Sequence, residues 1–284
     1  MDQQRLHRLL APRSLAFVGG REAEVAIGQC LALGFDGDLW PVHHRRDKVA
    51  GLPAFASVED LPAPPDAVLV AVNRWATVET VGRLAALGTG AAVCYASGFA
   101  EVGAAGAELQ NALVAAADGM PVIGPNCYGT VAATVGAALW PDQHGLRRVD
   151  RGVALVTQSG NIALNLTLQT RPMAISHVLT LGNQADVGIE ECGEALLDDP
   201  SVSSIGLHVE ALRDAGRFET ACRRAFAAGV PVVALKTGSS PRGASIAAST
   251  PHRWLATPPP TRPCSTVWAS GRSALSPNCW TPST

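Results

Sequence analysis

Acidic residues are missing from the last part of the 284-residue sequence. The final acidic residue is Glu219, and residues 220–284 hold seven Lys and Arg residues, a formal charge of +7. Residues 1–219 hold 15 basic and 24 acidic residues, a formal charge of −9. The whole chain therefore carries only −2. This near-neutral balance argues against a nucleic-acid-binding surface, and we expect no nucleic-acid partner.

Long apolar runs and paired cysteines are also lacking. No apolar run approaches the roughly 20 residues that a membrane span requires, and residues 1–13 lack the apolar core of a signal peptide. The seven cysteines form no Cys-x-x-Cys pair, and no metal-ligand spacing is evident. We therefore expect a cytoplasmic protein with reduced thiols, with no metal site and no membrane partner.

The composition is that of a globular protein, with 47% hydrophobic and 16% charged residues. Short apolar runs alternate with amphipathic segments, a pattern that predicts buried parallel strands joined by helices. The expected strands cover residues 14–19, 38–42, 66–72, 91–95, 121–123, 152–157, 175–181, 202–209 and 230–236. The expected helices cover residues 25–33, 76–87, 106–118, 189–197 and 214–228, and another begins near residue 160.

The rhythm of strands and helices is interrupted over residues 131–151, which are expected to form a connection. The sequence therefore predicts an α/β fold with two consecutive doubly wound parallel-sheet domains, the first Rossmann-like and the second flavodoxin-like. We expect the domains to cover residues 1–145 and 146–248. Residues 249–284 form an irregular tail that contains three of the six Trp and seven of the 20 Pro residues.

Four predicted strands end in turns that contain Gly or Asn, at residues 18–20, 97–99, 124–129 and 157–160. In parallel α/β sheets, ligands bind beyond the carboxyl ends of the strands. The first turn has two interpretations, because Gly19 and Gly20 with Gly28 lack the full Gly-x-Gly-x-x-Gly pattern. It is either a shortened dinucleotide loop or a plain tight turn.

Taken together, these segments resemble the NDP-forming acyl-CoA synthetases, the family that contains the α subunit of succinyl-CoA synthetase. The resemblance covers residues 10 to about 248. Its landmarks are Pro12-Arg13-Ser14-Leu15, Pro41-Val42, Gly51-Leu52-Pro53, Ser57-Val58-Glu59-Asp60-Leu61-Pro62, Ser97-Gly98-Phe99-Ala100-Glu101, Gly124-Pro125-Asn126-Cys127, Thr157-Gln158-Ser159-Gly160, Leu181-Gly182-Asn183-Gln184-Ala185-Asp186 and Leu235-Lys236.

The resemblance implies that the first domain binds coenzyme A. Its first loop would lie against the CoA phosphates through backbone N–H groups and a helix N-terminus. Arg45 would stand near a CoA phosphate, although a solvated surface charge is the alternative. Ser97 and Gly98 would lie near the thiol end or the adenine side, and Asn126 would order the loop beside the thiol. The implied CoA-binding residues are Gly19, Gly20, Arg21, Arg45, Val72, Ser97, Gly98, Asn126 and Cys127.

The resemblance also implies that the second domain holds a phosphoryl group carried on a histidine. Gln158, Ser159 and Gly160 close a strand and open a helix, which directs N–H groups toward an anion. Ser159 also has the simpler interpretation of a helix N-cap. Asn183 is expected to add to the phosphate site. Glu210 would hydrogen-bond the phosphorylated histidine, or else is an ordinary exposed glutamate.

The sequence departs from the family where the nucleophilic histidine is expected. After Ala247-Ala248-Ser249 the chain has Thr250 and Pro251, and His252 stands two positions late. His252 is the candidate nucleophile, with a histidine in an irregular tail as the alternative. No resemblance continues beyond Ser249, so a change of reading frame near this codon is one explanation. The ATP-grasp portion that binds ATP or GTP with Mg is absent and would come from a separate β-type partner.

Three functions follow from these features. The first is the α-type part of an NDP-forming ligase, which joins an acid to CoA with cleavage of a nucleoside triphosphate through a phosphohistidine. The second is a non-catalytic CoA- or acyl-CoA-binding module or a truncated relic, favoured by the missing histidine motif. The third, an NAD(P)-binding oxidoreductase, is disfavoured because His43 and His44 replace the expected acidic residue. Whether the chain is an active enzyme or a homo-oligomer stays open.

Overall fold

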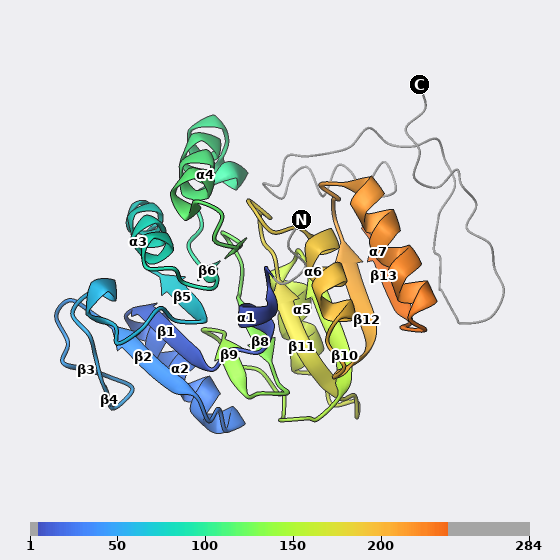
Figure 1. The fold of residues 1–284 in the computed structure, drawn as a ribbon, viewed down its shortest axis with the longest axis horizontal. Helices are drawn as coiled ribbons and strands as arrows, with labels where there is room; N and C mark the ends of the chain where they lie inside the picture. Colours follow the sequence, from blue (N-terminus) through green and yellow to red (C-terminus); the bar gives the residue numbers. More distant parts are fainter. Residues whose placement is uncertain (1–4, 238–284) are drawn as a thin grey trace.

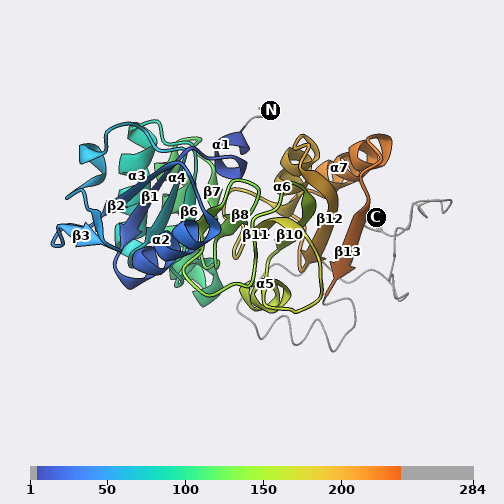
Figure 2. The same cartoon turned by 90° about the horizontal axis from the view of Figure 1, so that it is seen from below.

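The computed structural model describes residues 5–237, which form two α/β domains side by side (Figures 1 and 2). The first has a parallel sheet in the order β2-β1-β5-β6-β7. Its strand residues are apolar without alternation, as expected for strands covered on both faces. These strands are β1 (Ser14–Gly19), β2 (Asp38–Val42), β5 (Ala67–Ala71), β6 (Ala92–Cys94) and β7 (Val122–Ile123).

Helices cover both faces of the first sheet. On one face, α2 (Arg21–Leu33) packs between the sheet and the second domain, and on the other α3 (Arg74–Ala86) packs beside α4 (Ala104–Ala117). The smaller elements are α1 (His7–Leu10), β3 (Lys48–Val49), β4 (Leu52–Pro53), η1 (Val58–Asp60) and η2 (Ala100–Val102).

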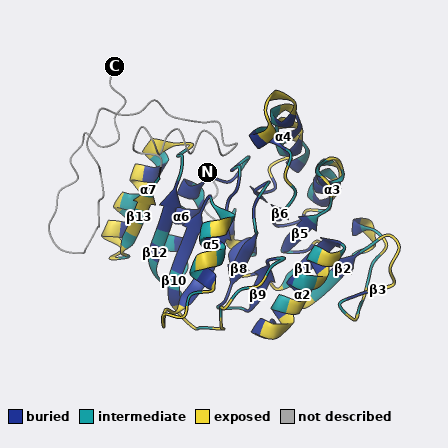
Figure 3. Cartoon of the chain, turned by 180° about the vertical axis from the view of Figure 1, so that it is seen from behind, coloured by how far each residue is buried: buried dark blue, intermediate teal, exposed yellow. Residues whose placement is uncertain are grey.

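The second sheet has the order β13-β12-β10-β11-β8-β9. Its four parallel strands are β10 (Gly152–Thr157), β11 (Ile175–Thr180), β12 (Val202–Val209) and β13 (Val232–Lys236). Helix α5 (Gly160–Thr167) covers one face, whereas α6 (Ile189–Leu197) and α7 (Ala215–Ala227) cover the other. Figure 3 shows buried strands between helices whose outer sides are exposed. The predicted α/β class with two parallel-sheet domains is confirmed.

The expected connection over residues 131–151 is wrong in its first part. Strands β8 (Thr130–Ala132) and β9 (Ala137–Leu139) form a hairpin, and β8 pairs antiparallel with β11. These short apolar strands are buried, and α2 packs on β9, where the Cys30 thiol donates to the Ala138 carbonyl at 3.3 Å. The hairpin thus pairs with one domain and packs on the other, and the boundary near residue 145 stays a prediction.

Two findings concern the membrane span and the metal site considered in the sequence analysis. Within residues 5–237, no helix is long and apolar enough to cross a membrane. The same residues contain no cluster of His, Cys, Asp or Glu side chains able to hold a metal ion. The predicted irregular tail and its candidate nucleophile His252 lie outside the described residues, as do Ser249 and Thr250.

Candidate functional site

The turn between β1 and α2 places glycine where no side chain fits. Gly19 has φ +149°, and a Cβ atom there would lie 2.6 Å from the carbonyl oxygen of Ala71. Gly20 precedes the first turn of α2, and space is open where its Cβ would be. Because the first N–H groups of a helix have no partners within it, this turn is suited to an anion.

The loop after β2 folds over the start of α2. The neutral Nδ1 of His43 accepts the backbone N–H groups of Arg45 and Arg46 at 3.1 and 3.2 Å. The Arg46 guanidinium lies 3.5 Å from Glu24 in the first turn of α2. The pKa of His43 is lowered, first by partial burial and then by the neighbouring cations. A neutral His43 can therefore hold the loop in place.

Both positive and negative side chains lie near this turn, and only the arginines would attract a phosphate. Arg21 and Arg45 are exposed, and the Arg45 Nε donates to His44 at 2.8 Å. Glu22 and Glu24 also lie in the first turn of α2, where they oppose an added anion. Arg46 partly neutralises Glu24. The donor set of backbone N–H groups with several arginines fits the phosphates of CoA.

The residues that follow β5 lie between the turn at the start of α2 and the turn at Gly98. Val72 is half-buried, and Asn73 caps α3 by accepting the N–H groups of its first turn at 3.1 Å. The Arg74 guanidinium donates to the Gly98 carbonyl at 3.0 Å and lies 5.1 Å from the centre of the exposed Trp75 ring. Arg74 and Trp75 were not among the candidates, because the resemblance offers no motif there.

Three of the predicted turns meet around the buried carboxylate of Glu101. Glu101 is 8% exposed and accepts the N–H of Gly98 at 2.5 Å. Its other oxygen accepts the side-chain amide of Asn183, from the second domain, also at 2.5 Å. Asn183 in turn accepts the amide of Asn126 at 3.3 Å and donates to Gln110 at 3.0 Å. Gly98, Asn126 and Asn183 thus meet at the junction of the domains.

The loops after β7 and β11 interlock at this junction. Asn183 N–H donates to the Pro125 carbonyl at 3.0 Å, and Ala185 N–H to the Gly124 carbonyl at 2.9 Å. Gly182 has φ +49°, and a Cβ there would lie 2.2 Å from the Asn126 carbonyl oxygen. The predicted CoA loop of one domain and the predicted phosphate loop of the other are therefore held together by backbone contacts.

Cys127 lies beneath the loop rather than on it. Its thiol is buried and donates to the Cys94 carbonyl at 3.4 Å. Burial raises the pKa of Cys127 to about 12, so the thiol is neutral. The residue fills space under the turn, and its place among CoA-contacting residues stays a prediction.

The turn between β10 and α5 faces the same junction. A Cβ at Gly160 would lie 2.1 Å from the ring of Tyr128, so the start of α5 packs against the loop after β7. The Ser159 N–H donates to Thr157 Oγ1 at 3.0 Å, and the Ser159 side chain makes no capping hydrogen bond. The N-cap alternative for Ser159 therefore has no side-chain bond to support it, whereas α5 still presents its N–H groups.

The Gln158 side chain forms hydrogen bonds with the backbone just after β12. Its Oε1 accepts the N–H groups of Glu210 and Ala211 at 2.6 and 2.8 Å, and its Nε2 donates to the Ala211 carbonyl at 2.5 Å. The side chain is buried and used within the protein. The predicted phosphate residue Gln158 therefore positions the predicted catalytic residue Glu210.

Two titratable side chains surround the end of β12. The Lys236 ammonium donates to the Glu210 carbonyl at 2.9 Å and to the Thr237 carbonyl, and burial lowers its pKa. His208 is buried with Nδ1 3.1 Å from Thr157 Oγ1, and burial also lowers the His208 pKa. Its Nε2 has no partner among the residues described here. Neither residue was a candidate, since both lie within predicted strands.

The structure therefore assembles the candidates in three groups. Gly19, Gly20, Arg21 and Arg45 surround the start of α2. Residues 97–98, 126 and 183 meet at the domain junction, and Gln158, Ser159, Gly160 and Glu210 lie at the ends of β10 and β12. No hydrogen bond within residues 5–237 joins the Asn183 side chain to Glu210.

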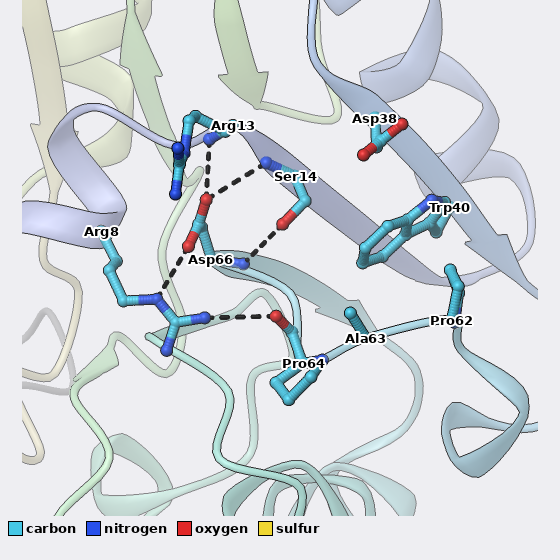
Figure 4. A pocket seen from close by; sticks show the side chains of 9 residues that line it. All are labelled: Arg8, Arg13, Ser14, Asp38, Trp40, Pro62, Ala63, Pro64 and Asp66. Carbon is cyan, nitrogen blue, oxygen red and sulfur yellow. Dashed lines mark hydrogen bonds and ion pairs between the residues drawn. The ribbon is translucent and has the colours of Figure 1, made fainter.

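A cleft of about 870 Å³ opens at the amino ends of β1, β2 and β5, the end of the first sheet opposite the predicted site (Figure 4). Asp66 accepts the Arg8 guanidinium at 2.8 Å and the Arg13 N–H at 2.8 Å, across the cleft from Trp40. None of the predicted site residues lines it. The lining residues are Arg8, Arg13, Ser14, Asp38, Trp40, Pro62, Ala63, Pro64 and Asp66.

Two family models match consecutive parts of the chain. A CoA binding domain matches residues 13–133, and a succinyl-CoA ligase like flavodoxin domain matches residues 150–257. The first range contains the first sheet together with β8, the second contains β10 to β13, and β9 lies between the two ranges.

Curated relatives are considerably longer than this chain. A trans-feruloyl-CoA synthase from an unknown prokaryotic organism is 35% identical over 260 residues, 87% of this chain and 37% of the relative. The α subunit of ADP-forming acetate–CoA ligase II from Pyrococcus furiosus is 28% identical over 249 residues, 84% of this chain and 53% of the relative. The chain thus spans between about a third and a half of these relatives.

Solved structures show the same arrangement of domains. A dinucleotide-forming acetyl-coenzyme A synthetase 1 from Ca. Korarchaeum cryptofilum, in complex with phosphate and ADP, superposes with a TM-score of 0.78 at 26% identity. The match covers 89% of this chain and 56% of that chain. The models, relatives and fold agree with one another: the chain belongs to the NDP-forming acyl-CoA synthetase family, with a CoA-binding domain followed by a succinyl-CoA ligase-like flavodoxin domain.

Proposed function

We propose that this chain is the CoA-binding, α-type part of an NDP-forming acyl-CoA synthetase. The observation that carries the proposal is the interlocking of the loops after β7 and β11, through Asn183 N–H and Ala185 N–H. The loops bring the carboxyl ends of both sheets to one place. In sheets of this kind those ends are where ligands bind.

In this proposal the CoA phosphates lie at the start of α2, against Gly19, Gly20 and Arg21, with Arg45 as a counter-charge. The open space beside Gly20 and the exposed arginines support this placement. Val72 borders the site, and the thiol end extends toward Ser97, Gly98 and Asn126 at the junction. The thiol then meets the acyl group where the two domains touch.

The second domain would accept a phosphoryl group near the N-terminus of α5, with the Gly160 N–H and the Ser159 hydroxyl as donors, since the Ser159 N–H already donates to Thr157 Oγ1. Glu210 would orient the imidazole of a phosphorylated histidine, and the proposed acceptor is His252, outside the described residues. The overall reaction is acid plus CoA plus nucleoside triphosphate to acyl-CoA, nucleoside diphosphate and phosphate. The thiol of CoA attacks an acyl phosphate and releases inorganic phosphate.

We further propose that an ATP-grasp partner of the β type supplies ATP or GTP with Mg²⁺. The relatives are named for feruloyl, acetyl and 4-hydroxybutyryl transfer to CoA, so the substrate class is a carboxylic acid. The five described cysteines are free thiols, which supports the expected cytoplasmic location.

The proposal is tested by phosphoryl transfer. The purified full chain is incubated with γ-³²P-labelled ATP and Mg²⁺, with and without a candidate ATP-grasp partner. We expect acid-labile label on this chain only with the partner, and loss of label when CoA and a carboxylic acid are added. His252→Asn should abolish the label, whereas substitution of the exposed His7 in α1, His7→Asn, should not.

The non-catalytic CoA-binding module is the alternative outcome of the same experiment. Tight CoA binding without label in any combination would support it and contradict the catalytic proposal. Label that persists in His252→Asn would place the acceptor elsewhere.

A further inference from the structure

Two glutamates are buried among residues 5–237, Glu101 and Glu190, and of these the carboxylate of Glu101 contacts the predicted CoA turn. It lies in η2, one turn after the predicted CoA turn. One oxygen accepts the Gly98 N–H at 2.5 Å, and the other accepts the Phe99 N–H at 3.1 Å. The carboxylate therefore fixes two consecutive peptide groups of the turn.

Gly98 is held on its other side by a charge of opposite sign. The Arg74 guanidinium donates to the Gly98 carbonyl at 3.0 Å. Gly98 has φ +96°, a conformation that other residues rarely adopt, and a Cβ there would meet the Arg74 guanidinium at 2.5 Å. Two charged side chains thus orient this turn, and charge-assisted hydrogen bonds are stronger than neutral ones.

The third donor to Glu101 comes from the other domain. The Asn183 amide donates to the same Glu101 oxygen as Phe99, at 2.5 Å. The remaining amide hydrogen of Asn183 reaches Gln110, and its oxygen accepts from Asn126. Every hydrogen-bonding atom of the Asn183 side chain is engaged, so displacing the second-domain loop breaks the network at Glu101.

We propose that Glu101 is a positioning residue that couples the turn at Ser97–Gly98 to the second-domain loop at Asn183. This inference rests on the proposed function, because it assumes that the turn contacts CoA. CoA binding and the seating of the second domain then depend on one carboxylate. Glu101 itself touches neither the thiol nor the phosphoryl group.

Substitutions of Glu101 and of Asn183, the two partners in the contact, separate this positioning role from a purely stabilising one. Glu101→Ala removes all three acceptor contacts, whereas Glu101→Gln keeps only one oxygen. Asn183→Asp places two carboxylates against each other, and adding Glu101→Gln restores an amide opposite a carboxylate. Recovery in that double variant is specific to the contact between the two side chains.

The experiment is a calorimetric titration of CoA into the full chain, with urea unfolding to confirm that each variant is folded. We expect Glu101→Ala and Asn183→Asp to weaken CoA binding at least tenfold, with Glu101→Gln between them and the wild type. The double variant should recover at least half of the Asn183→Asp loss on a logarithmic scale. Glu108→Gln, exposed on α4, is the matched control and should stay within twofold of the wild type.

Two results would overturn the inference, and they differ. If the wild type binds CoA and folded Glu101→Ala binds within twofold of it, the inference fails while the proposed function stands. A lowered unfolding midpoint with unchanged affinity leads to the same conclusion, a structural role only. If the wild type does not bind CoA, the proposed function fails and the inference fails with it.

Discussion

At the scale of single residues, the domain junction depends on glycines that admit no side chain. Gly182 has φ +49°, and its Cβ position lies 2.2–2.3 Å from the carbonyl oxygens of Asn126 and Pro125. Both obstructing atoms belong to the backbone, which cannot rotate away as a side chain would. The close approach of the two loops therefore requires glycine at this position.

Gly182→Ala should destabilise the protein by about 1–3 kcal/mol, because the loops must separate to admit the methyl group. Urea unfolding at pH 7.5 measures the change. Gly28→Ala is the control, since Gly28 is exposed within α2 and its Cβ position is open. That substitution should stabilise by roughly 1 kcal/mol through helix propensity. Equal stability of the two variants would contradict the packing described here.

A second residue-scale prediction concerns Gln158. Replacement by Ala leaves the N–H groups of Glu210 and Ala211 without their acceptor, which should cost about 1–3 kcal/mol. Phosphoryl labelling should fall strongly while CoA affinity changes less than twofold, because the CoA turns lie in the other domain. A loss of CoA affinity equal to the loss of labelling would instead make Gln158 part of the CoA site.

At the scale of elements, the start of α2 combines unpaired N–H groups with arginines on the loop after β2. Arg45→Ala should weaken CoA binding about tenfold, the range expected for a charged hydrogen bond to phosphate. The loss should shrink as salt is raised from 50 to 500 mM, since salt screens exposed charges. Titration calorimetry measures both.

Arg223→Ala is the matched control for this prediction. Arg223 is exposed on α7 and pairs with Glu219 one turn away, remote from the CoA turns. Its removal should leave CoA affinity unchanged. An Arg45→Ala protein that binds CoA like the wild type would show that Arg45 is an ordinary surface charge.

The elements show how far the sequence predicts this fold. Apolar runs identify every parallel strand of both sheets, and the inner strands need such runs because they are buried on both faces. Strand β13, at the edge of its sheet, is also apolar although Val233 and Leu235 are exposed. The β8–β9 hairpin escapes this test, since its three-residue strands are too short for periodicity and pair only in tertiary structure. Helix α2 begins four residues before its expected start at residue 25, because Gly20 gives no capping signal.

The site is less predictable than the fold for a physical reason. The strand-end turns are local and appear in the sequence as Gly and Asn motifs. The contacts of Glu101 with Asn183 and of Gln158 with Glu210 span 82 and 52 residues, and no local pattern encodes them. The side chains of Asn183 and Gln158 make hydrogen bonds within the protein, and their expected place at a phosphate stays a prediction.

At the scale of the whole molecule, buried and half-buried histidines should make stability depend on pH. Burial lowers the pKa of His144, His177 and His208, although Asp199 partly opposes this at His177. Below about pH 6.5 the unfolded chain therefore binds more protons than the folded one. Stability should be full above that pH and fall as pH drops toward 5, by up to about 1.4 kcal/mol per pH unit for each histidine.

Urea unfolding between pH 5 and 8 measures this dependence. His177→Gln should reduce the slope, because His177 is 1% exposed and burial lowers its pKa in the folded protein. Measurements at pH 8, where the histidines are neutral in both states, separate the loss of packing from the loss of titration. A slope unchanged by the substitution would contradict this assignment.

The proposed function requires that this chain bind CoA at the carboxyl ends of the strands of its first sheet. Calorimetric titration of the full chain with CoA, and separately with NAD, tests it most directly. We expect one CoA site that is weakened by Arg45→Ala and no detectable binding of NAD. Absence of CoA binding by the folded chain, or binding of NAD alone, would contradict it.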